Sequence, residues 1–250
     1  MNKLSYQLYS SRNFGTLSET LQMIADLGYA QAEGYGGLYA SPSDVAALKD
    51  ALAATDLEMP SGHFGLDQVE NDAAGVVEIA RQLGVSKVFV PHLAADLRPD
   101  SMDGWKAFGA RLSKAGAPLV DAGLSFGWHN HDFEFTAIDG GYPIEAILDG
   151  GPDLEFEFDV AWAVRAGEDP IAWTKKLGDR IVAAHVKDIA PAGQCEDEDG
   201  WADVGHGVID WTACMAALRG VGCGLFVAEH DNPNDDARFA RRSIETFKTL

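Results

Sequence analysis

Residues 71–93, NDAAGVVEIARQLGVSKVFVPHL, contain one helical pattern followed by one strand-like run. Between residues 71 and 84 apolar side chains recur at three- and four-residue intervals, which is typical of an amphipathic helix. Gly84 stands where helices commonly end. Residues 87–93 are rich in β-branched and aromatic side chains, as strands are. The stretch therefore predicts a helix that packs against one strand of a sheet.

The same alternation of strands and helices runs through the whole chain. Further helical patterns include residues 16–28 and 41–56. Strand-like runs stand at residues 5–10, 29–35, 58–64, 87–93, 124–131, 154–160, 180–188 and 224–231. Eight strands that each precede a helix, at roughly 30 residues per unit, predict an α/β fold: a single (β/α)8 TIM barrel over residues 1–250.

A doubly wound open sheet is the alternative arrangement. Such a sheet would normally carry a glycine-rich phosphate-binding loop after its first strand. Residues 10–19, SSRNFGTLSE, match that loop poorly, and no linker or composition shift divides the chain. We therefore expect the barrel, in which active sites lie at the C-terminal ends of the strands.

The charge of the chain limits its partners. Its 250 residues include 19 basic and 39 acidic side chains, and the net charge of −20 disfavours a nucleic-acid partner because it repels phosphate backbones. No apolar run approaches the ~18 residues that a membrane span needs, and the first residues are too polar for a secretory signal. We therefore expect a cytoplasmic protein without a membrane partner.

Residues 126–135, FGWHNHDFEF, place two histidines at the end of a predicted strand. Strand side chains alternate between the barrel interior and the helix layer. Phe126 and Trp128 are therefore expected to face the helices, and His129 and His131 to point into the barrel. One histidine at a strand end is more often a hydrogen-bonded structural residue than a ligand, so a metal site needs support from other strands.

The same rule turns further polar residues inward on three neighbouring strands: Glu155, Glu157 and Asp159, then His185 and Lys187, then Glu229 and Asp231. Buried carboxylates raise one another's pKa and lose hydration, so their convergence is costly. A divalent cation held by Asp159, Glu229, His185 and either His129 or His131 would offset that cost. Mixed nitrogen and oxygen ligands suit Zn²⁺, Mn²⁺, Co²⁺ or Fe²⁺ better than Ca²⁺.

At these residues the sequence resembles the sugar phosphate isomerase/epimerase family, which has a xylose-isomerase-like TIM barrel. The resemblance covers nearly the whole chain and rests on SYQLYS, GYAQAEGYGG, GWHNHDFEF, EFDVAW, AGEDP, DRIVAAHVKD, GHGVIDW and VAEHD. The most specific pieces are HNHDFEF, FDVAW with Asp159 and HVKD with His185. The resemblance implies one divalent metal ion (Mn, Zn, Co or Fe) with one ligand on each of strands five to eight.

Carried over to this chain, the implied metal ligands are His129, Asp159, His185 and Glu229. The better-studied epimerases have a glutamate followed by Asn-His at the strand-five position, whereas this chain has His129 there. His131 is the substitute if the register of that strand is different.

The resemblance also implies a reaction. It predicts a metal-dependent isomerase or epimerase that acts on a small sugar or keto-sugar by proton abstraction beside a metal-bound carbonyl. The epimerase-like members use two glutamates for the proton, of which only Glu229 remains here, so His131 is the expected second proton carrier. Lys187 is the third expected catalytic residue, through contact with a substrate oxygen. The alternative for Lys187 is a salt bridge to Glu157 or Asp188.

Two other functions remain open. The HNH form also resembles relatives that eliminate water or a leaving group, so the alternative reaction is that of a lyase, dehydratase or hydrolase of keto-sugars or keto-glycosides. A catalytically silent sugar-binding subunit is the alternative from another class of protein. The sequence leaves the substrate, the native metal and the oligomeric state open, and the resemblance allows a homodimer.

Four further residues are expected to bind substrate. Glu33 and His63 could contact sugar hydroxyls, and Trp162, like Tyr35, could cover an apolar ring face, although packing explains each of these two at least as well. His206 stands in Gly-His-Gly, where the family usually has Gly-Glu-Gly.

Overall fold

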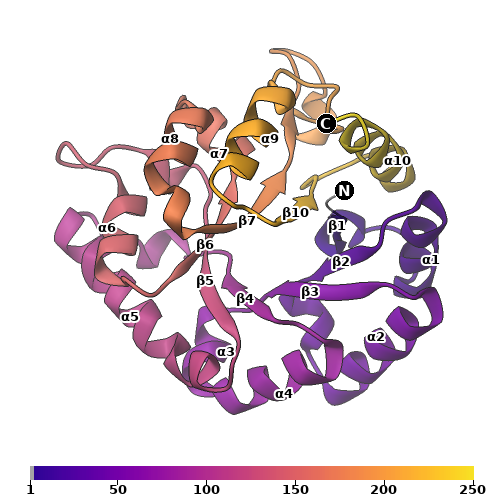
Figure 1. The fold of residues 1–250 in the computed structure, drawn as a ribbon, viewed down its shortest axis with the longest axis horizontal. Helices are drawn as coiled ribbons and strands as arrows, with labels where there is room; N and C mark the ends of the chain where they lie inside the picture. Colours follow the sequence, from indigo (N-terminus) through magenta and orange to yellow (C-terminus); the bar gives the residue numbers. More distant parts are fainter. Residues whose placement is uncertain (1–2) are drawn as a thin grey trace.

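A computed structural model describes residues 3–250 and shows a closed barrel of eight parallel strands (Figure 1). Around the barrel the order of the strands is β1-β10-β7-β6-β5-β4-β3-β2. Their bounds are β1 (Leu4–Gln7), β2 (Gln31–Gly34), β3 (Glu58–His63), β4 (Lys87–Val90), β5 (Ser125–His129), β6 (Glu155–Asp159), β7 (Ile181–Val186) and β10 (Leu225–Ala228). The predicted (β/α)8 TIM barrel is confirmed.

Helices connect successive strands and surround the barrel (Figure 1). The α-helices are α1 (Leu17–Leu27), α2 (Pro42–Thr55), α3 (Leu66–Asn71), α4 (Ala73–Leu83), α5 (Met102–Asp121), α6 (Pro143–Gly150), α7 (Val160–Arg165), α8 (Pro170–Leu177), α9 (Trp211–Gly220) and α10 (Asp236–Phe247). Short 3-10 helices are η1 (Leu8–Ser11), η2 (Gly36–Tyr39), η3 (Ala95–Leu97), η4 (Phe133–Phe135), η5 (Gly178–Arg180) and η6 (Glu196–Glu198). Over residues 3–250, no helix has both the length and the apolar character that crossing a membrane requires.

A short antiparallel pair, β8 (Asp188–Ile189) and β9 (Trp201–Ala202), stands outside the barrel between β7 and α9. It extends the chain beyond the C-terminal end of β7. Trp201 is buried there, and its ring lies 4.7 Å from that of Trp162 in α7. The pair therefore adds packed structure next to the open end of the barrel.

The helix signals in the sequence match the observed ends. Within the stretch 71–93, Ala73–Leu83 form α4 and Lys87–Val90 form β4, and Gly84 ends α4 in the left-handed conformation at φ 78°. Glycine adopts this conformation without the steric cost that a side chain would bring. At the start of α1, Thr16 and Glu19 form a capping box, in which each side chain accepts a hydrogen bond from the other residue's backbone.

The predicted strands extend past the observed ones at their C-terminal ends. The run 5–10 was expected to be one strand, but β1 ends at Gln7 and the next residues form η1. The side chain of Gln7 accepts a hydrogen bond from the backbone of Tyr9 and so caps η1. Similarly, β4 ends at Val90 because Pro91 follows it and has no N–H for the sheet.

Two apolar layers lie on opposite faces of the barrel wall. The larger one packs between strands and helices and includes Phe126, Trp128, Phe156 and Phe158, as the alternation predicted. Inside the barrel, a separate small cluster consists of Phe89, Ala183, Leu225 and Val227. Ala183 and Val227 precede His185 and Glu229 by two residues, so the apolar cluster lies one level deeper than those two polar side chains.

Candidate metal centre and active site

The four predicted ligands lie together at the C-terminal end of the barrel. His129 ends β5, Asp159 ends β6, His185 lies in β7 and Glu229 follows β10. All four are buried, and each offers one ligand atom that lies within 4.8 Å of the others. The structure thus brings this set together with His129 as its strand-five member.

Asp159 shows that this group of side chains fits a cation. Its Oδ1 accepts a hydrogen bond of 3.0 Å from the backbone of Trp162 and caps α7. Its Oδ2 is buried and has no hydrogen-bond partner among the described residues, and it lies 3.9 Å from both His185 Nδ1 and Lys187 Nζ. Burial raises the pKa of Asp159 to about 6. A free carboxylate oxygen beside two imidazoles and a second carboxylate provides the mixed donors that divalent transition metals take.

Carboxylates hold both ring nitrogens of His185. Its Nδ1 lies 2.9 Å from Glu229 Oε2, and its Nε2 lies 2.8 Å from Glu33 Oε1. Burial alone would lower the pKa of His185, but Glu157, Glu229 and Glu33 raise it well above the usual value. The contact with Glu33 fixes the orientation of the ring, as outer carboxylates do for metal-binding histidines.

Glu157 holds His129 in the same way. Its Oε2 lies 3.1 Å from His129 Nδ1 and 2.6 Å from His63 Nε2, and His63 Nε2 lies 3.3 Å from Glu33 Oε1. His63 therefore joins the two carboxylates that support His129 and His185. With Glu157, these three histidines form a second group whose geometry could hold a metal.

The role of Glu157 is one that the sequence reasoning missed. Glu157 was expected on the inward face of its strand and was considered as an ion-pair partner of Lys187, but it was given no role in supporting the metal ligands. The signal was present, because Glu157 precedes Asp159 by two residues and so shares its face of β6. Alternation gives the face of a strand but not the depth of a residue in the barrel.

Glu33 lies beneath the cavity rather than in its wall. It is fully buried, and its carboxylate accepts hydrogen bonds from Gln7 Nε2 at 2.8 Å and from Ser61 Oγ. His63 and His185 lower the pKa of Glu33 to about 2, although burial opposes them. The structure thus places Glu33, which was expected to contact substrate, behind a predicted metal ligand.

The other three expected substrate residues have different surroundings. His63 lines the cavity and is 7% exposed. Trp162 packs its ring 5.1 Å from that of His131 and 4.7 Å from that of Trp201. His206 is exposed on the loop between β9 and α9. Of these three, only His63 is among the described residues that line the cavity.

Lys187 is fully buried behind the cavity wall. Its ammonium group donates hydrogen bonds to Asp231 Oδ1 at 2.5 Å and to Glu229 Oε2 at 3.3 Å. It also lies 4.3 Å from the ring centre of Trp201 and 5.0 Å from that of Trp162. Its ion-pair partners are Asp231, Glu229 and, at 3.9 Å, Asp159. Lys187 therefore does form salt bridges, but the expected partners Glu157 and Asp188 are wrong.

Asn130, in the HNHDFEF motif, links the ends of β5 and β6 through hydrogen bonds. Asn130 accepts a hydrogen bond from the backbone N–H of Asp159 at 2.9 Å and donates one to its carbonyl oxygen at 3.1 Å. Glu134 is fully buried and accepts hydrogen bonds from Trp128 Nε1 at 2.8 Å and from the backbone of His131 at 2.9 Å. Both residues fix the positions of the histidines on either side of Asn130.

His131 lines the cavity with its ring between aromatic neighbours. The ring stacks on Phe133 with centroids 6.0 Å apart and contacts Trp162. Its Nδ1 is buried and has no partner within the described part of the chain. Burial, together with the nearby charge of Lys187, lowers the pKa of His131 to about 3. The imidazole is therefore neutral and has one nitrogen free for a ligand.

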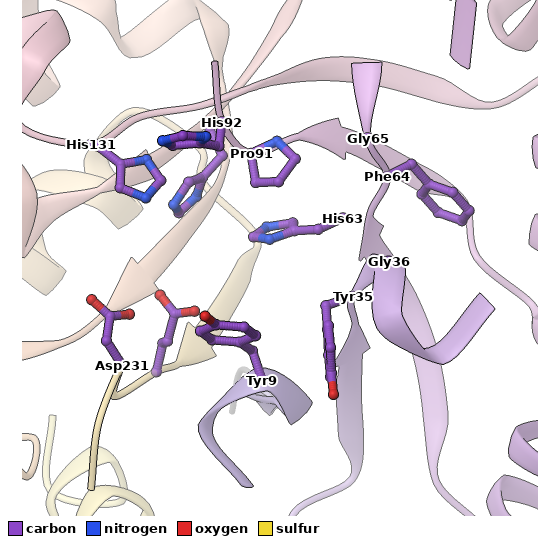
Figure 2. Close-up of a pocket in the computed structure, with 12 residues that line it drawn as sticks. Tyr9, Tyr35, Gly36, His63, Phe64, Gly65, Pro91, His92, His131 and Asp231 are labelled. Atoms are coloured by element: carbon purple, nitrogen blue, oxygen red, sulfur yellow. The ribbon is translucent and has the colours of Figure 1, made fainter. Parts of the chain in front are cut away.

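A cavity of about 590 Å³ opens beside the four predicted ligands (Figure 2). Two of them, His129 and Glu229, reach its wall. The remaining wall consists of Tyr9, Tyr35, Gly36, His63, Phe64, Gly65, Pro91, His92, His131 and Asp231. The candidate metal centre thus adjoins a space of the size that holds small organic ligands.

Known proteins resemble this chain in sequence and in fold. Inosose dehydratase of Clostridium beijerinckii is 23% identical over 195 residues, which cover 70% of this chain and 64% of that protein. The chain therefore spans less than two thirds of the length of that curated relative. A sugar phosphate isomerase/epimerase from Parabacteroides distasonis has a TM-score of 0.83 at 20% identity, covering all of this chain and 94% of the other. The IOLI protein, solved with a zinc atom, has a TM-score of 0.76 at 16% identity, covering 99% and 97%.

The structural matches show the shared barrel. Residues 21–250 match the xylose isomerase-like TIM barrel family, which confirms the resemblance that the motifs indicated. This chain belongs to the xylose isomerase-like TIM barrel family, a family of enzymes.

Proposed function

We propose that this protein is a divalent-metal-dependent isomerase or epimerase that moves a proton at the carbon beside the carbonyl of a small keto-sugar. The observation that carries the proposal is the free, buried Oδ2 of Asp159, which lies among His129, His185 and Glu229 at the edge of the cavity. These four residues would hold the metal, with Mn, Zn, Co and Fe as the candidates for their mixed donors. The bound metal would supply Lewis-acid polarisation of the substrate carbonyl.

The chain's own residues would move the proton. The carboxylate of Glu229 reaches the cavity and can take a proton from the carbon beside the carbonyl. His131 lines the cavity as a neutral imidazole and can exchange a proton with the substrate from another direction. Lys187 does not line the cavity in the described residues; it would act by holding the carboxylates of Glu229 and Asp231 in place.

Elimination is a second candidate reaction, and Asp231 favours it. Asp231 follows Glu229 by two residues and lines the same cavity, and burial raises the pKa of its carboxyl group although the ammonium group of Lys187 lowers it. In this reaction Glu229 removes the proton, the C–O bond at the next carbon breaks, and the departing oxygen takes a proton from Asp231. The products are an unsaturated ketone and either water or an alcohol. The name of the inosose dehydratase relative is consistent with such a reaction.

One experiment separates the two reactions. Metal-loaded protein is incubated with keto-sugars and keto-glycosides in D₂O, and products are followed by NMR and mass spectrometry. Deuterium at the carbon beside the carbonyl, with no substituent lost, supports isomerisation or epimerisation. Release of water or of the glycoside substituent supports elimination or hydrolysis. If neither occurs, both proposals are contradicted.

The Glu229→Gln variant and a matched Glu155→Gln variant complete this experiment. We expect Glu229→Gln to lose deuterium exchange and substituent release alike. Glu155 lies on the same inward face but near the other end of β6, beside Lys87 and Ser125. We expect Glu155→Gln to keep the wild-type rate, so a comparable loss in this variant would contradict the assignment of Glu229.

A further inference from the structure

The cavity has two chemically different halves (Figure 2). His131 and Asp231 lie on one side of Figure 2, and Tyr35 and Gly36 lie on the other. The first half contains the imidazoles and carboxylates that the proposed reaction needs. The second half offers aromatic rings and backbone, which no step of that reaction uses.

Two tyrosines form the aromatic surface of the second half. The rings of Tyr9 and Tyr35 meet edge to face with centroids 5.3 Å apart, and Tyr9 is 37% exposed. The Arg12 guanidinium lies 3.9 Å from the ring centre of Tyr9, and Arg12 Nη1 donates hydrogen bonds to the carbonyl oxygens of Tyr9 and Asp231. Because the rings are already held, a ligand that packs on them costs little additional ordering of the protein.

The space beside these rings is left open by the neighbouring residues. A Cβ added at Gly36 would meet no described atom within 4 Å. Phe64 borders the cavity, but its ring is fully buried and stacks on Tyr39 with centroids 4.5 Å apart. In Figure 2 that ring points away from the other lining residues. The aromatic half is therefore available to a ligand.

The charges around the cavity disfavour a phosphorylated ligand. The described residues that line it include the carboxylates of Glu229 and Asp231 but no lysine or arginine. The ammonium group of Lys187 is fully buried and paired with those carboxylates. Arginine and lysine side chains commonly bind phosphate groups, so a sugar phosphate would place its charge near two carboxylates with no cationic side chain among the described lining residues.

The size of the cavity agrees with a ligand larger than one sugar ring. Sites for drug-sized molecules measure roughly 300–1,000 Å³, and this cavity measures about 590 Å³. We propose that the substrate is an uncharged keto-sugar that carries an apolar ring as a substituent, that is, an aryl keto-glycoside. Its sugar lies beside Glu229 and His131, and its apolar ring packs on Tyr9 and Tyr35. The position of the sugar rests on the proposed function, whereas the position of the ring rests on the aromatic half alone.

Calorimetric binding to the metal-loaded protein tests this proposal without turnover. The probes are phenyl β-D-glucopyranoside, D-glucose and D-glucose 6-phosphate. We expect the phenyl glucoside to bind roughly tenfold more tightly than glucose, as one aromatic contact of this kind provides. We expect glucose 6-phosphate to bind no more tightly than glucose. The proposal would be overturned if glucose 6-phosphate bound more tightly than the phenyl glucoside, or if the phenyl glucoside showed no measurable binding.

Variants of the two tyrosines identify where the phenyl group lies. Tyr9→Ala and Tyr35→Ala should each reduce the preference for the phenyl glucoside over glucose to within about twofold. Tyr9→Phe and Tyr35→Phe keep the rings and should retain the preference. If the preference survives in both alanine variants, the phenyl group does not pack on these rings and the proposal fails.

These binding measurements, combined with the D₂O exchange experiment and with steady-state kinetics on keto-sugars, separate this proposal from the proposed function. A tyrosine-dependent phenyl preference without proton exchange on any keto-sugar supports the aromatic subsite and contradicts the proposed reaction. Equal kcat/KM for keto-sugars with and without a phenyl group overturns the subsite while it supports the reaction.

Discussion

Buried carboxylates next to α10 and buried carboxylates at the open end of the barrel have different partners. Next to α10, Asp203 is 3% exposed and accepts hydrogen bonds from Arg238 Nε at 2.9 Å and from Arg242 Nη1 at 3.0 Å. Glu198 is 5% exposed and pairs with Arg238 Nη2 at 2.5 Å. Guanidinium groups of the chain itself thus neutralise both acids.

At the open end of the barrel, imidazoles and one lysine surround the carboxylates. Asp159 Oδ2 and Glu157 Oε1 are buried and have no hydrogen-bond partner among residues 3–250. Because such groups are costly when unpaired, a cation from outside the chain would stabilise them. The arginine-paired group is therefore complete as it stands, whereas the barrel group has unpaired carboxylate oxygens that could hold a metal ion.

The largest expected effect comes from Asp159→Asn. Asparagine can still cap α7 but removes the charge and one anionic donor, so metal content and activity should fall together. We expect metal affinity to drop by more than about 100-fold, since outer carboxylates alone account for roughly 10–100-fold. Elemental analysis after dialysis, with circular dichroism as the check of folding, measures this. Full metal content in the variant would show that Asp159 is not a ligand.

Arg238→Met tests the arginine-paired carboxylates next to α10. It leaves Glu198 without its guanidinium partner and Asp203 with Arg242 alone. We expect the free energy of unfolding to fall by about 3 kcal/mol, the order of loss when a buried pair is broken. Urea denaturation measures the loss, and metal content should stay at the wild-type level. A parallel loss of metal in the folded variant would mean that the two groups are coupled.

Glu157→Gln should weaken the metal site without removing a proposed ligand. The variant loses the charge that holds His129 Nδ1 and His63 Nε2, so metal affinity should fall by roughly 10–100-fold. Competition with a metal-chelating dye measures the affinity. Glu155→Gln, two residues earlier on β6, is the matched control and should keep the wild-type value. An unchanged affinity in Glu157→Gln would show that Glu157 does not support the ligands.

Among residues 3–250, Glu134 is a buried carboxyl group with neither arginine partners nor a place among the candidate metal ligands. Its effect on the pH dependence of stability is the smallest that we expect. Its hydrogen-bond donors are the neutral Trp128 Nε1 and the backbone of His131, and burial raises its pKa to about 8. The folded state therefore holds the proton on Glu134 more strongly than the unfolded state does. The contribution of this group to the free energy of unfolding is largest at low pH and is lost as pH rises towards 8. Relative to Glu134→Gln, the wild type should lose roughly 1 kcal/mol per pH unit between pH 6 and 8. Parallel pH profiles of the two proteins would contradict this.

The local sequence pattern was sufficient to predict the barrel. It was also sufficient to predict which polar residues at the strand ends face the barrel interior. In the run 154–160, period two alone assigns Phe156 and Phe158 to the helix layer and Glu157 and Asp159 to the interior. Similarly, the helix-end signal at Gly84 depends only on neighbouring residues. These features were predictable because the interactions that determine them are short in sequence.

Depth in the barrel and long-range partners were not predictable in this way. Glu33 faces inward as expected, but the height of β2 relative to β7 places it beneath His185 instead of in the cavity wall. That height depends on strand register, which shifts between β2 and β3. The partner of Lys187 is Asp231, 44 residues away on another strand end. No local pattern identifies such a pair.

The pairing of β1 with β10 has a consequence for biosynthesis. Tyr9 and Glu229 share the cavity wall, and Arg12 reaches the carbonyl oxygen of Asp231 across 219 residues of sequence. Strand β1 emerges from the ribosome long before β10 has been synthesised. Contacts between segments so distant in sequence form late and slowly. A nascent chain that stops before β10 lacks Glu229 and one wall of the cavity, so the ability to bind substrate arises only when the barrel closes.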